Sequence, residues 1–183
     1  MLLDEYKKRD EPVLIRMVVV LGVVAVIVVF TLSRISGARS DQVSADEVWA
    51  YLQEQAPKQG LDPEFVYALA WAESRLNARA RSSEARGIMQ LTKPTWQAVS
   101  EKSYRHAWDW RTNMRVGIDY LVFCRDYLKK HDSFSYPLLA ASYRYGPYYV
   151  KSQHFKIRRL KEPRNEIYKR IFEGNICPVA PPQ

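Results

Sequence analysis

An almost unbroken apolar run near the N-terminus constrains the fold of this chain more than any other feature. The run extends from Val13 to Leu32, a length of 20 residues, and Arg16 is its one charged residue. A helix of that length rises about 30 Å, which matches the hydrocarbon core of a bilayer. Arg16 lies near one end, from which its long side chain can reach the interface. The run has no polar face, so it predicts a single transmembrane helix over residues 13–32.

Basic residues flank this run unevenly. Four precede its centre and two follow it closely: Lys7, Lys8, Arg9 and Arg16, then Arg34 and Arg39. This bias predicts a cytoplasmic N-terminal tail over residues 1–12 and a domain outside the cytoplasm after the run. In a bacterium, the chain would be a single-pass protein of the inner membrane with a periplasmic domain. A cleaved signal peptide, with its site at Ser36-Gly37-Ala38, is the alternative that the sequence leaves open.

After the run, the sequence predicts an all-α arrangement. A linker over residues 33–43 precedes one helical domain, 44–175, and a disordered tail, 176–183. Apolar residues recur at helical spacing, and no stretch shows the alternation typical of a strand. Residues 77–87 are expected to form a loop, and residues 102–110 to be irregular. Capping residues and prolines predict helices over residues 44–55, from 62 through 73, and over 92–101, 111–130, 135–146 and 162–174.

The chain is basic, with a formal net charge of +8, and one segment is especially so. Residues 151–170 contain eight basic and two acidic side chains. We interpret this segment first as a solvated face beside the membrane. A patch that attracts anionic cell-wall polymer or anionic lipid is the second interpretation. No nucleic-acid partner is expected, because a domain outside the cytoplasm would not meet one routinely.

The residues that usually bind metals or form disulfide frameworks are few. Cys124 and Cys177 are the two cysteines, which is too few for a disulfide scaffold and leaves open one bridge or two free thiols. The three histidines are scattered, and there is no C-x-x-C motif. The sequence therefore predicts neither a metal site nor a cofactor.

A carboxylate stands at the end of an otherwise apolar helical run. Glu73 follows the run from Phe65 to Ala72, and on a helix it shares a face with Phe65, Leu69 and Leu76. Burial on that face would raise the pKa of the Glu73 carboxyl and suit it to act as a general acid. The alternative is an ordinary ion pair with one of the arginines that follow closely: Arg75, Arg79, Arg81 and Arg86.

Three blocks of sequence resemble the soluble lytic transglycosylase (SLT) family, bacterial lysozyme-like enzymes that cut peptidoglycan glycan strands. The first block, 73–90, contains Glu-Ser, an Asn, a loop serine and Gly-Ile-Met-Gln, like the catalytic stretch of that family. The second, 113–121, resembles its N-x-x-x-G-x-x-Y-L helix, and the third, 141–147, resembles its A-x-Y-N-A-G-P segment. The blocks occur in the family's order, so the chain looks like a membrane-anchored member with a lysozyme-like fold.

The resemblance implies roles for individual residues. Glu73 would be the catalytic acid and base, and the glycan groove would be lined by Ser74, Ser82, Gly87, Met89, Gln90 and Tyr143. The loop over residues 82–87 is one residue shorter than usual and lacks the family's Gly before Ala, which leaves open whether Ser82 or Ser83 matches the loop serine. Arg144 and Tyr145 replace the usual Asn and Ala after the tyrosine.

The reaction implied is cleavage of the β-1,4 bond between MurNAc and GlcNAc in peptidoglycan, with closure of a 1,6-anhydroMurNAc ring. The family uses one carboxylate where most glycosidases use two. The candidates for a second one are Glu84, Asp109 and Asp119, and none lies in a motif recognised as catalytic. A lysozyme-type hydrolase on the same fold is one alternative. A non-catalytic peptidoglycan-binding scaffold of an envelope-spanning machine is another, and such a machine is a possible partner.

Overall fold

Helices form most of residues 41–183, the part of the chain that the computed structural model describes. Three predicted segments lie wholly or mostly outside the described residues: the N-terminal cytoplasmic tail 1–12, the transmembrane segment 13–32 and the linker 33–43. No helix within residues 41–183 has the length and apolar character needed to cross a membrane. The helices are α2 (Ala45–Gln55), α3 (Pro63–Ser74), α4 (Lys93–Val99), α5 (Trp110–Lys130), α6 (Tyr136–Tyr145), α7 (Pro147–Ser152) and α8 (Glu166–Phe172), with 3-10 turns at Pro57–Gln59, Tyr104–Trp108 and Ile157–Arg159.

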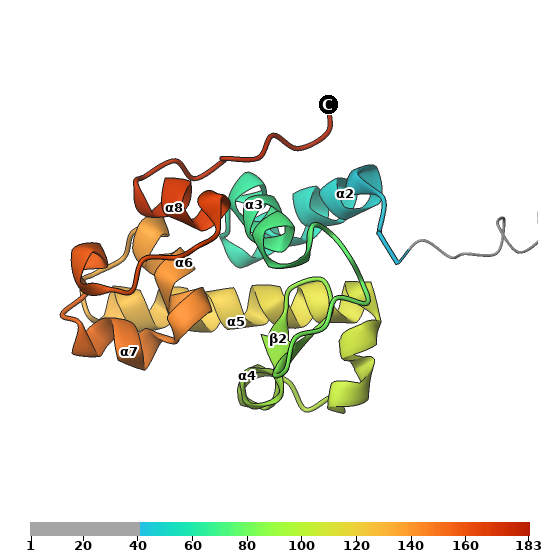
Figure 1. The fold of residues 1–183 in the computed structure, drawn as a ribbon. Coiled ribbons are helices and arrows are strands. Elements are labelled where there is room, and N and C mark those ends of the chain that lie inside the picture. The colour runs from blue at the N-terminus through green and yellow to red at the C-terminus, as the bar shows by residue number, and fades with distance from the viewer. Residues whose placement is uncertain (1–40) are drawn as a thin grey trace, which may run out of the picture. The chain divides into compact units, whose positions relative to one another are not determined.

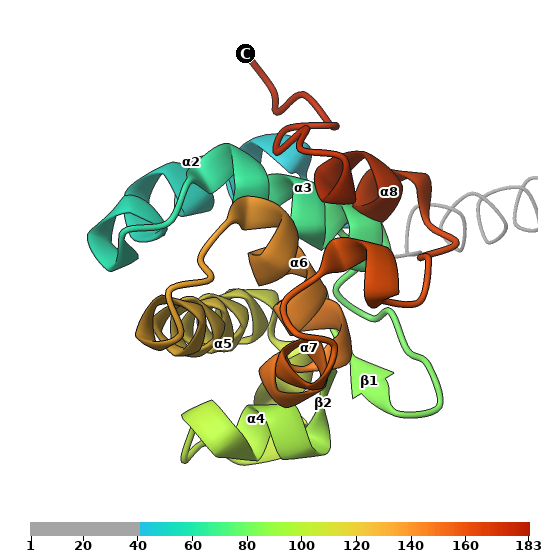
Figure 2. The ribbon, with the colours of Figure 1, turned by 90° about the vertical axis from the view of Figure 1, so that its left-hand side faces the viewer.

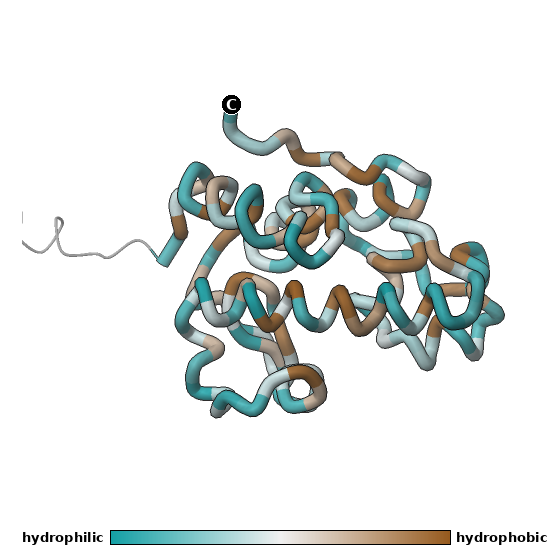
Figure 3. Tube along the Cα trace, turned by 180° about the vertical axis from the view of Figure 1, so that it is seen from behind, coloured by the Kyte–Doolittle hydropathy of each residue, from teal (hydrophilic) through white to brown (hydrophobic). Residues whose placement is uncertain are grey.

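Helix α5 runs through the middle of this domain (Figure 1). Helices α2, α3 and α8 lie on one side of it, and α4 with the two short strands lies on the other. Apolar positions recur along α5 at helical spacing (Figure 3), and its buried side chains include Met114, Ile118, Leu121, Cys124 and Leu128. The predicted helix over 111–130 is therefore confirmed, and its apolar stripe packs against α4 on one flank and α6 on another.

Helix α3 is capped and buried as its sequence predicts. The Asp62 carboxylate accepts hydrogen bonds from the backbone N–H groups of Glu64 and Phe65, and Pro63 occupies the first helical position. All residues from 65 to 70 are buried. The helix ends at Arg75, whose φ of 52° is left-handed. This ending places Glu73 in the last turn, at the edge of the core.

Helix α6 stands between α5 and α8 (Figure 2) and packs against both. The Ser135 hydroxyl accepts a hydrogen bond from the Leu138 N–H at its start, and Gly146, with a φ of 88°, ends it as predicted. Helix α7, which begins directly at Pro147, was not predicted. The Gly-Pro pair indicates a stop, yet proline at the first position also starts the next helix.

Three further predictions differ from the structure. The all-α prediction missed an antiparallel pair of strands, β1 (Ala85–Arg86) and β2 (Leu91–Thr92). Two residues are too few for alternation to appear in a sequence. The last helix begins at Glu166, four residues after Glu162, because the Asn165 side chain, rather than Pro163, caps it. The predicted disordered tail has no helix or strand within 176–183, but Ile176 and Val179 are partly buried against the core.

The cysteines are free thiols in this part of the chain. Cys124 is buried on α5, and Cys177 is partly exposed near the C-terminus. Of the two alternatives left by the sequence, the structure has two thiols. Burial raises the pKa of the Cys124 thiol to about 12, so the thiol is protonated near neutral pH.

Candidate active site

Glu73 faces a hollow of about 570 Å³. Its side chain is 15% exposed, because Phe65 and Leu69 on the same face of α3 are fully buried while the last turn of α3 reaches the surface. Leu76 is buried too, but the prediction that it shares this helical face is wrong, because α3 ends at Ser74 and Leu76 has a left-handed φ of 63°. We call this space the Glu73 hollow. It is lined by Glu73, Ser82, Glu84, Gln90, Leu91, Thr92, Thr95, Tyr120, Tyr143, Arg144, Tyr145 and Gly146.

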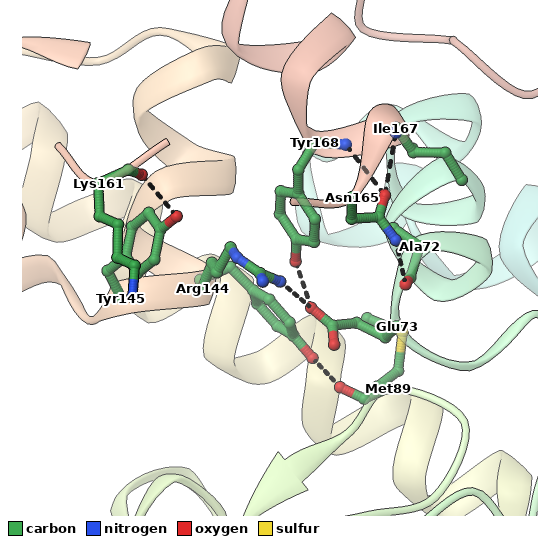
Figure 4. A network of polar contacts seen from close by, with 10 residues as sticks. Ala72, Glu73, Met89, Arg144, Tyr145, Lys161, Asn165, Ile167 and Tyr168 are labelled. Carbon is green, nitrogen blue, oxygen red and sulfur yellow. Dashed lines mark hydrogen bonds and ion pairs between the residues drawn. The ribbon is translucent and has the colours of Figure 1, made fainter. Parts of the chain in front are cut away.

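Two side chains from the C-terminal half of the domain contact the Glu73 carboxylate (Figure 4). The Tyr168 hydroxyl on α8 donates a hydrogen bond to Oε1. The Nη1 atom of Arg144, on α6, lies 4.0 Å from the same oxygen. The Arg144 guanidinium lies 4.6 Å from the centre of the Tyr168 ring, at a distance typical of a cation–π contact. Glu73 is thus paired with an arginine, but not with any of the four that follow it in the sequence.

The surroundings of Glu73 act on its pKa in opposite directions. Burial raises the pKa of the carboxyl, while the hydrogen bond from Tyr168 and the charge of Arg144 lower it, and the net shift is upward. Burial also raises the pKa of Tyr168 well above 10, so its phenol remains a donor. The carboxyl therefore has support in its ionised form and a raised affinity for a proton, which is what a group that both gives and takes a proton requires.

The loop from Gly87 to Gln90 forms one wall of the site. Gly87 has a φ of 81°, and a Cβ there would lie 2.3 Å from both the Ala107 carbonyl oxygen and the Asn113 Nδ2. At Gly87 the absence of a side chain is expected to permit an unusual dihedral or a close approach of the backbone to a sugar. The structure has the unusual dihedral, and the close neighbours are other parts of the protein, so an approach to a sugar stays a prediction.

The buried Asn113 side chain fixes the backbone of this loop. Its Oδ1 accepts a hydrogen bond from the Met89 N–H at 2.9 Å. Its Nδ2 donates to the carbonyls of Arg86 and Ala107, both at 3.0 Å. The amide therefore ties the start of α5 to the turn on both sides of Gly87. This is the structural role of the asparagine in the second matching block.

Three of the predicted site residues secure the same loop through hydrogen bonds. The Tyr143 hydroxyl donates to the Met89 carbonyl at 2.7 Å, and the Ser74 hydroxyl donates to the Ile88 carbonyl at 2.7 Å. The Gln90 side chain donates to the carbonyls of Ala80 and Gly87, at 2.9 and 3.0 Å. These contacts join α3, α6 and the loop into one unit around Glu73.

The predicted site residues divide into two groups. Glu73, Ser82, Gln90 and Tyr143 line the Glu73 hollow. Ser74, Gly87 and Met89 lie behind it and position its wall. Met89 is buried and packs on Gly117, where a Cβ would come within 2.9 Å of the Met89 Cγ. Contact between any of these side chains and a sugar stays a prediction.

The two loop serines and the three candidate second carboxylates differ in whether they line the Glu73 hollow. Ser82 lines both the Glu73 hollow and a neighbouring one, whereas Ser83 lines the neighbouring one and not the Glu73 hollow. Glu84 lines both hollows. Asp109 instead caps α5 by accepting from the Thr112 N–H, and Asp119 lies on α5 and does not line the Glu73 hollow. Glu84 is therefore the second carboxylate that shares the hollow with Glu73.

Sequence reasoning missed the residues that contact Glu73 directly. Tyr168 lies within the last predicted helix, 162–174, and its ring is buried, but its hydroxyl reaches a carboxylate 95 residues away. Asn165 makes this possible, because its Oδ1 caps α8 and its Nδ2 donates to the Ala72 carbonyl at 3.0 Å. Arg144 was noted as a departure from the family pattern, which was the available signal. No group of histidine, cysteine or acidic side chains in the described part of the chain is arranged to hold a metal ion.

Comparison with known proteins identifies the fold and the family. The Transglycosylase SLT domain matches residues 50–165. Among solved structures, the chain is similar to an inactive mutant of the lytic transglycosylase Slt from Pseudomonas aeruginosa, with a TM-score of 0.51 and 21% sequence identity. The match covers 69% of this chain and 20% of that one, so the chain spans about a fifth of the length of this relative. A comparison with curated proteins found no match. The family match covers more than half of the sequence and includes Glu73 and Arg144, and the chain belongs to the Transglycosylase SLT domain family.

Proposed function

We propose that the chain is a peptidoglycan lytic transglycosylase that cleaves the β-1,4 bond between MurNAc and GlcNAc and leaves a 1,6-anhydroMurNAc end. The observation that carries the proposal is the state of Glu73. It is a largely buried carboxyl in a hollow, its pKa is raised, and Tyr168 and Arg144 stabilise its ionised form. One group with these properties can serve as acid and then as base.

In the first step, protonated Glu73 donates its proton to the glycosidic oxygen, and the bond to the anomeric carbon of MurNAc breaks. GlcNAc leaves with a free hydroxyl. The N-acetyl oxygen of the same MurNAc assists at the anomeric carbon, as in substrate-assisted glycosidases. Negative charge then appears on Glu73, where the Tyr168 hydroxyl and the Arg144 guanidinium are already in place to stabilise it.

In the second step, the Glu73 carboxylate takes the proton from the C6 hydroxyl of that MurNAc. The O6 atom attacks the anomeric carbon, displaces the N-acetyl oxygen and closes the 1,6-anhydro ring. Glu73 returns to its protonated form, and no water is consumed. The polar wall of the hollow, which includes Ser82, Gln90 and Tyr143, would position the sugar during both steps.

A lysozyme-type hydrolase is the second candidate, and the position of Glu84 favours it. Glu84 lines the same hollow as Glu73, so it could orient a water molecule toward the anomeric carbon. The products of the two reactions differ by one water. Hydrolysis in labelled water would place heavy oxygen on the new sugar end, whereas the transglycosylase reaction would place none there.

The test combines product analysis with a matched pair of substitutions. Wild-type protein should yield anhydro ends without heavy oxygen from labelled water, as measured by mass spectrometry. Glu73→Gln should lower the rate of cutting by about a hundredfold to ten-thousandfold, since general acid–base catalysis contributes about that much. Glu84→Gln, the same change in the same hollow, should leave anhydro products and most of the rate.

Other outcomes would assign the protein differently. Heavy oxygen in the product together with a large loss in Glu84→Gln would identify a hydrolase. Binding of glycan without any cutting by wild type would instead leave the non-catalytic scaffold. Activity of Glu73→Gln within a few-fold of wild type would mean that another residue is the acid.

The proposal includes the position of the protein in the cell. Residues 13–32 would anchor the chain in the bacterial inner membrane, with the Glu73 domain on the periplasmic side. The support is the apolar run and the four-to-two bias of basic residues around it. N-terminal sequencing of the mature protein from membranes tests the anchor, because a start just after Ala38 would show a cleaved signal peptide.

A further inference from the structure

A second, smaller hollow lies beside the Glu73 hollow. Its volume is about 350 Å³, and we call it the Arg164 hollow. It is lined by Arg144, Tyr145, Lys161, Glu162, Pro163 and Arg164. Arg144 and Tyr145 also line the Glu73 hollow, so the two spaces share a wall. Arg144, which contacts Glu73, therefore also faces the Arg164 hollow.

The Arg164 hollow has an excess of positive charge. Three of its lining residues are cationic and one, Glu162, is acidic. The Glu162 carboxylate lies 3.7 Å from the Lys169 Nζ, so its charge is shared with a cation outside the hollow. Within residues 41–183, neither Lys161 nor Arg164 has an ion-pair partner. An anion that enters the hollow would meet two cations that have no carboxylate partner in this part of the chain.

The wall between the hollows is held in place before any ligand arrives. The Tyr145 hydroxyl donates to the Lys161 carbonyl at 2.8 Å, which fixes the end of α6 to the segment that carries Lys161 (Figure 4). The Arg144 guanidinium lies over the rings of Tyr168 and Tyr145, at 4.6 and 5.7 Å from their centres. Pro163 is buried behind the exposed cations. A site whose groups are already positioned loses less conformational freedom on binding.

We propose that the Arg164 hollow binds a carboxylate of the peptide attached to the MurNAc residue at the bond that is cut. This inference rests on the proposed function. In peptidoglycan, the peptide is joined to the lactyl group of MurNAc, so it leaves the glycan strand at the sugar that must lie beside Glu73. Peptides that are not cross-linked end in a free carboxylate, and arginine and lysine are suited to bind one.

The position of Arg144 favours this hollow as the peptide site. Its guanidinium contacts Glu73 on one side and lines the Arg164 hollow on the other. A group bound there is separated from the reacting carboxyl by one side chain. Arg144 supplies charge to both hollows, and the ring of Tyr145 supports its guanidinium. The preference for charged peptides should therefore depend on this pair.

The experiment measures binding with full-length Glu73→Gln protein, which should turn over the ligand at least about a hundredfold more slowly than wild type. Three short glycan probes are compared: one that carries peptides with free carboxyls, the same probe with its carboxyls amidated, and the same glycan without peptides. The free-acid probe should bind several-fold more tightly than the other two. The difference should shrink in about 0.5 M salt, because exposed charges are then screened.

Substitutions in the same background assign the preference to this hollow. Lys161→Gln and Arg164→Gln should each weaken binding of the free-acid probe about two- to fivefold, as expected for partly exposed ion pairs. Neither should change binding of the amidated probe. Arg159→Gln is the matched control, since Arg159 is an exposed cation of the same segment that does not line the hollow. It should leave all three affinities within experimental error of the parent.

Each outcome decides the matter. Equal affinity of the parent for free-acid and amidated probes would overturn the inference, and so would a loss in Arg159→Gln equal to that in Arg164→Gln. Cutting of peptide-free glycan by wild-type protein is assayed in parallel. If wild type cuts that glycan but the parent shows no carboxylate preference, the inference alone fails. If wild type cuts no glycan with or without peptides, the proposed function fails and the inference falls with it.

Discussion

Two walls surround Glu73, and they differ in whether their side chains bond to the backbone of a loop or to the Glu73 carboxylate. The loop wall consists of Gly87–Gln90 with the side chains of Asn113 and Tyr143 behind it. In its hydrogen bonds, side chains donate to backbone carbonyls and accept from a backbone N–H group, and most of its members are buried. None of these bonds ends on the Glu73 carboxylate. The loop wall therefore sets the shape of the hollow.

The charged wall consists of Arg144, Tyr145 and Tyr168. Two of these residues contact the Glu73 carboxylate directly, and Arg144 is held over both tyrosine rings. This wall comes from the end of α6 and from α8, and it includes the residues that depart from the family pattern. The two walls should therefore affect different properties of the protein. Changes in the loop wall should act through stability, and changes in the charged wall should act through the pKa of Glu73.

The largest expected effect tests the loop wall. Gly87→Ala should destabilise the protein by about 2–5 kcal/mol, because it adds a left-handed backbone strain of about 1–2 kcal/mol to overpacking of about 1–3 kcal/mol. The new Cβ would meet the Ala107 carbonyl and the Asn113 amide at 2.3 Å. Chemical unfolding followed by circular dichroism measures the change.

Gly146→Ala is the matched control for this prediction. Gly146 has a similar φ of 88°, but a Cβ there would meet nothing within 4 Å. With a ψ of 139° it lies outside the left-handed α region, so the substitution should cost only the strain of a sparsely populated backbone conformation, about 1–3 kcal/mol. Equal costs at Gly87 and Gly146 would show that close packing against Asn113 contributes nothing to the loop wall.

The next prediction compares two tyrosines, one in each wall. Tyr168→Phe removes a hydrogen bond to the ionised carboxylate, so the pKa of Glu73 should rise further. In the proposed reaction the protonated acid acts first, so the fall of kcat/KM at alkaline pH should move to higher pH. Loss of a hydrogen bond to a charged group should also lower the rate about tenfold or more. Rates measured on peptide-free glycan from pH 4 to 9 test both effects.

Tyr143→Phe supplies the contrast. The Tyr143 hydroxyl donates to the Met89 carbonyl and to no carboxylate. Its removal should destabilise the protein by about 1–3 kcal/mol, since a buried carbonyl loses its donor. The pH profile should keep its midpoint. If Tyr143→Phe moved the alkaline limb as far as Tyr168→Phe does, the two walls would not differ in function.

The loop wall and the helices were more predictable from sequence than the charged wall, and the reason is distance along the chain. The apolar stripe of α5, the cap of α3 at Asp62 and the burial of Glu73 each depend on residues within one or two turns. The matching blocks led to Gly87 and Tyr143. Their contacts also join residues far apart in the sequence, which local patterns do not predict. The resemblance to the family nevertheless identified both residues as members of the site.

The failures also have local explanations. Pro163 resembles the first residue of a helix, but Asn165 has both the capping oxygen and a bond to the Ala72 carbonyl, so α8 starts there. That start directs Tyr168 toward Glu73. No periodicity in the sequence signals a contact between residues that far apart. The strands at Ala85–Arg86 and Leu91–Thr92 escaped notice because two residues carry no period.

A third prediction uses stability to test the ionisation of Glu73. Its pKa is raised above the ordinary value of 4.5 in the folded protein. Above pH 4.5 the unfolded chain therefore holds fewer protons than the folded one, and stability falls as pH rises toward the folded pKa. Glu73→Gln has no such proton, so its advantage over wild type should grow from pH 4 to 7. Unfolding free energies of both proteins across that range test this. A difference between the two free energies that stays constant with pH would mean that folding does not shift the pKa of the Glu73 carboxyl.

The smallest expected effect concerns Arg144. The charge of Arg144 lowers the pKa of Glu73 less than the Tyr168 hydrogen bond does, and the Arg144 side chain is 31% exposed. Arg144→Asn, which restores the usual family residue, should therefore move the alkaline limb of kcat/KM upward by less than Tyr168→Phe does. The change in rate on peptide-free glycan should be about two- to fivefold, as for a solvent-screened pair.

Salt distinguishes the charge of Arg144 from a steric role. In wild type, high salt should weaken the pull of Arg144 on Glu73 and move the alkaline limb toward that of Arg144→Asn. The variant itself should respond little. Peptide-free glycan is the substrate of choice, because it removes any contribution of Arg144 to peptide binding. If the two proteins keep their separation in about 0.5 M salt, the guanidinium acts by packing on Tyr168, and the charged wall would differ from the loop wall only in the hydrogen bond that Tyr168 donates.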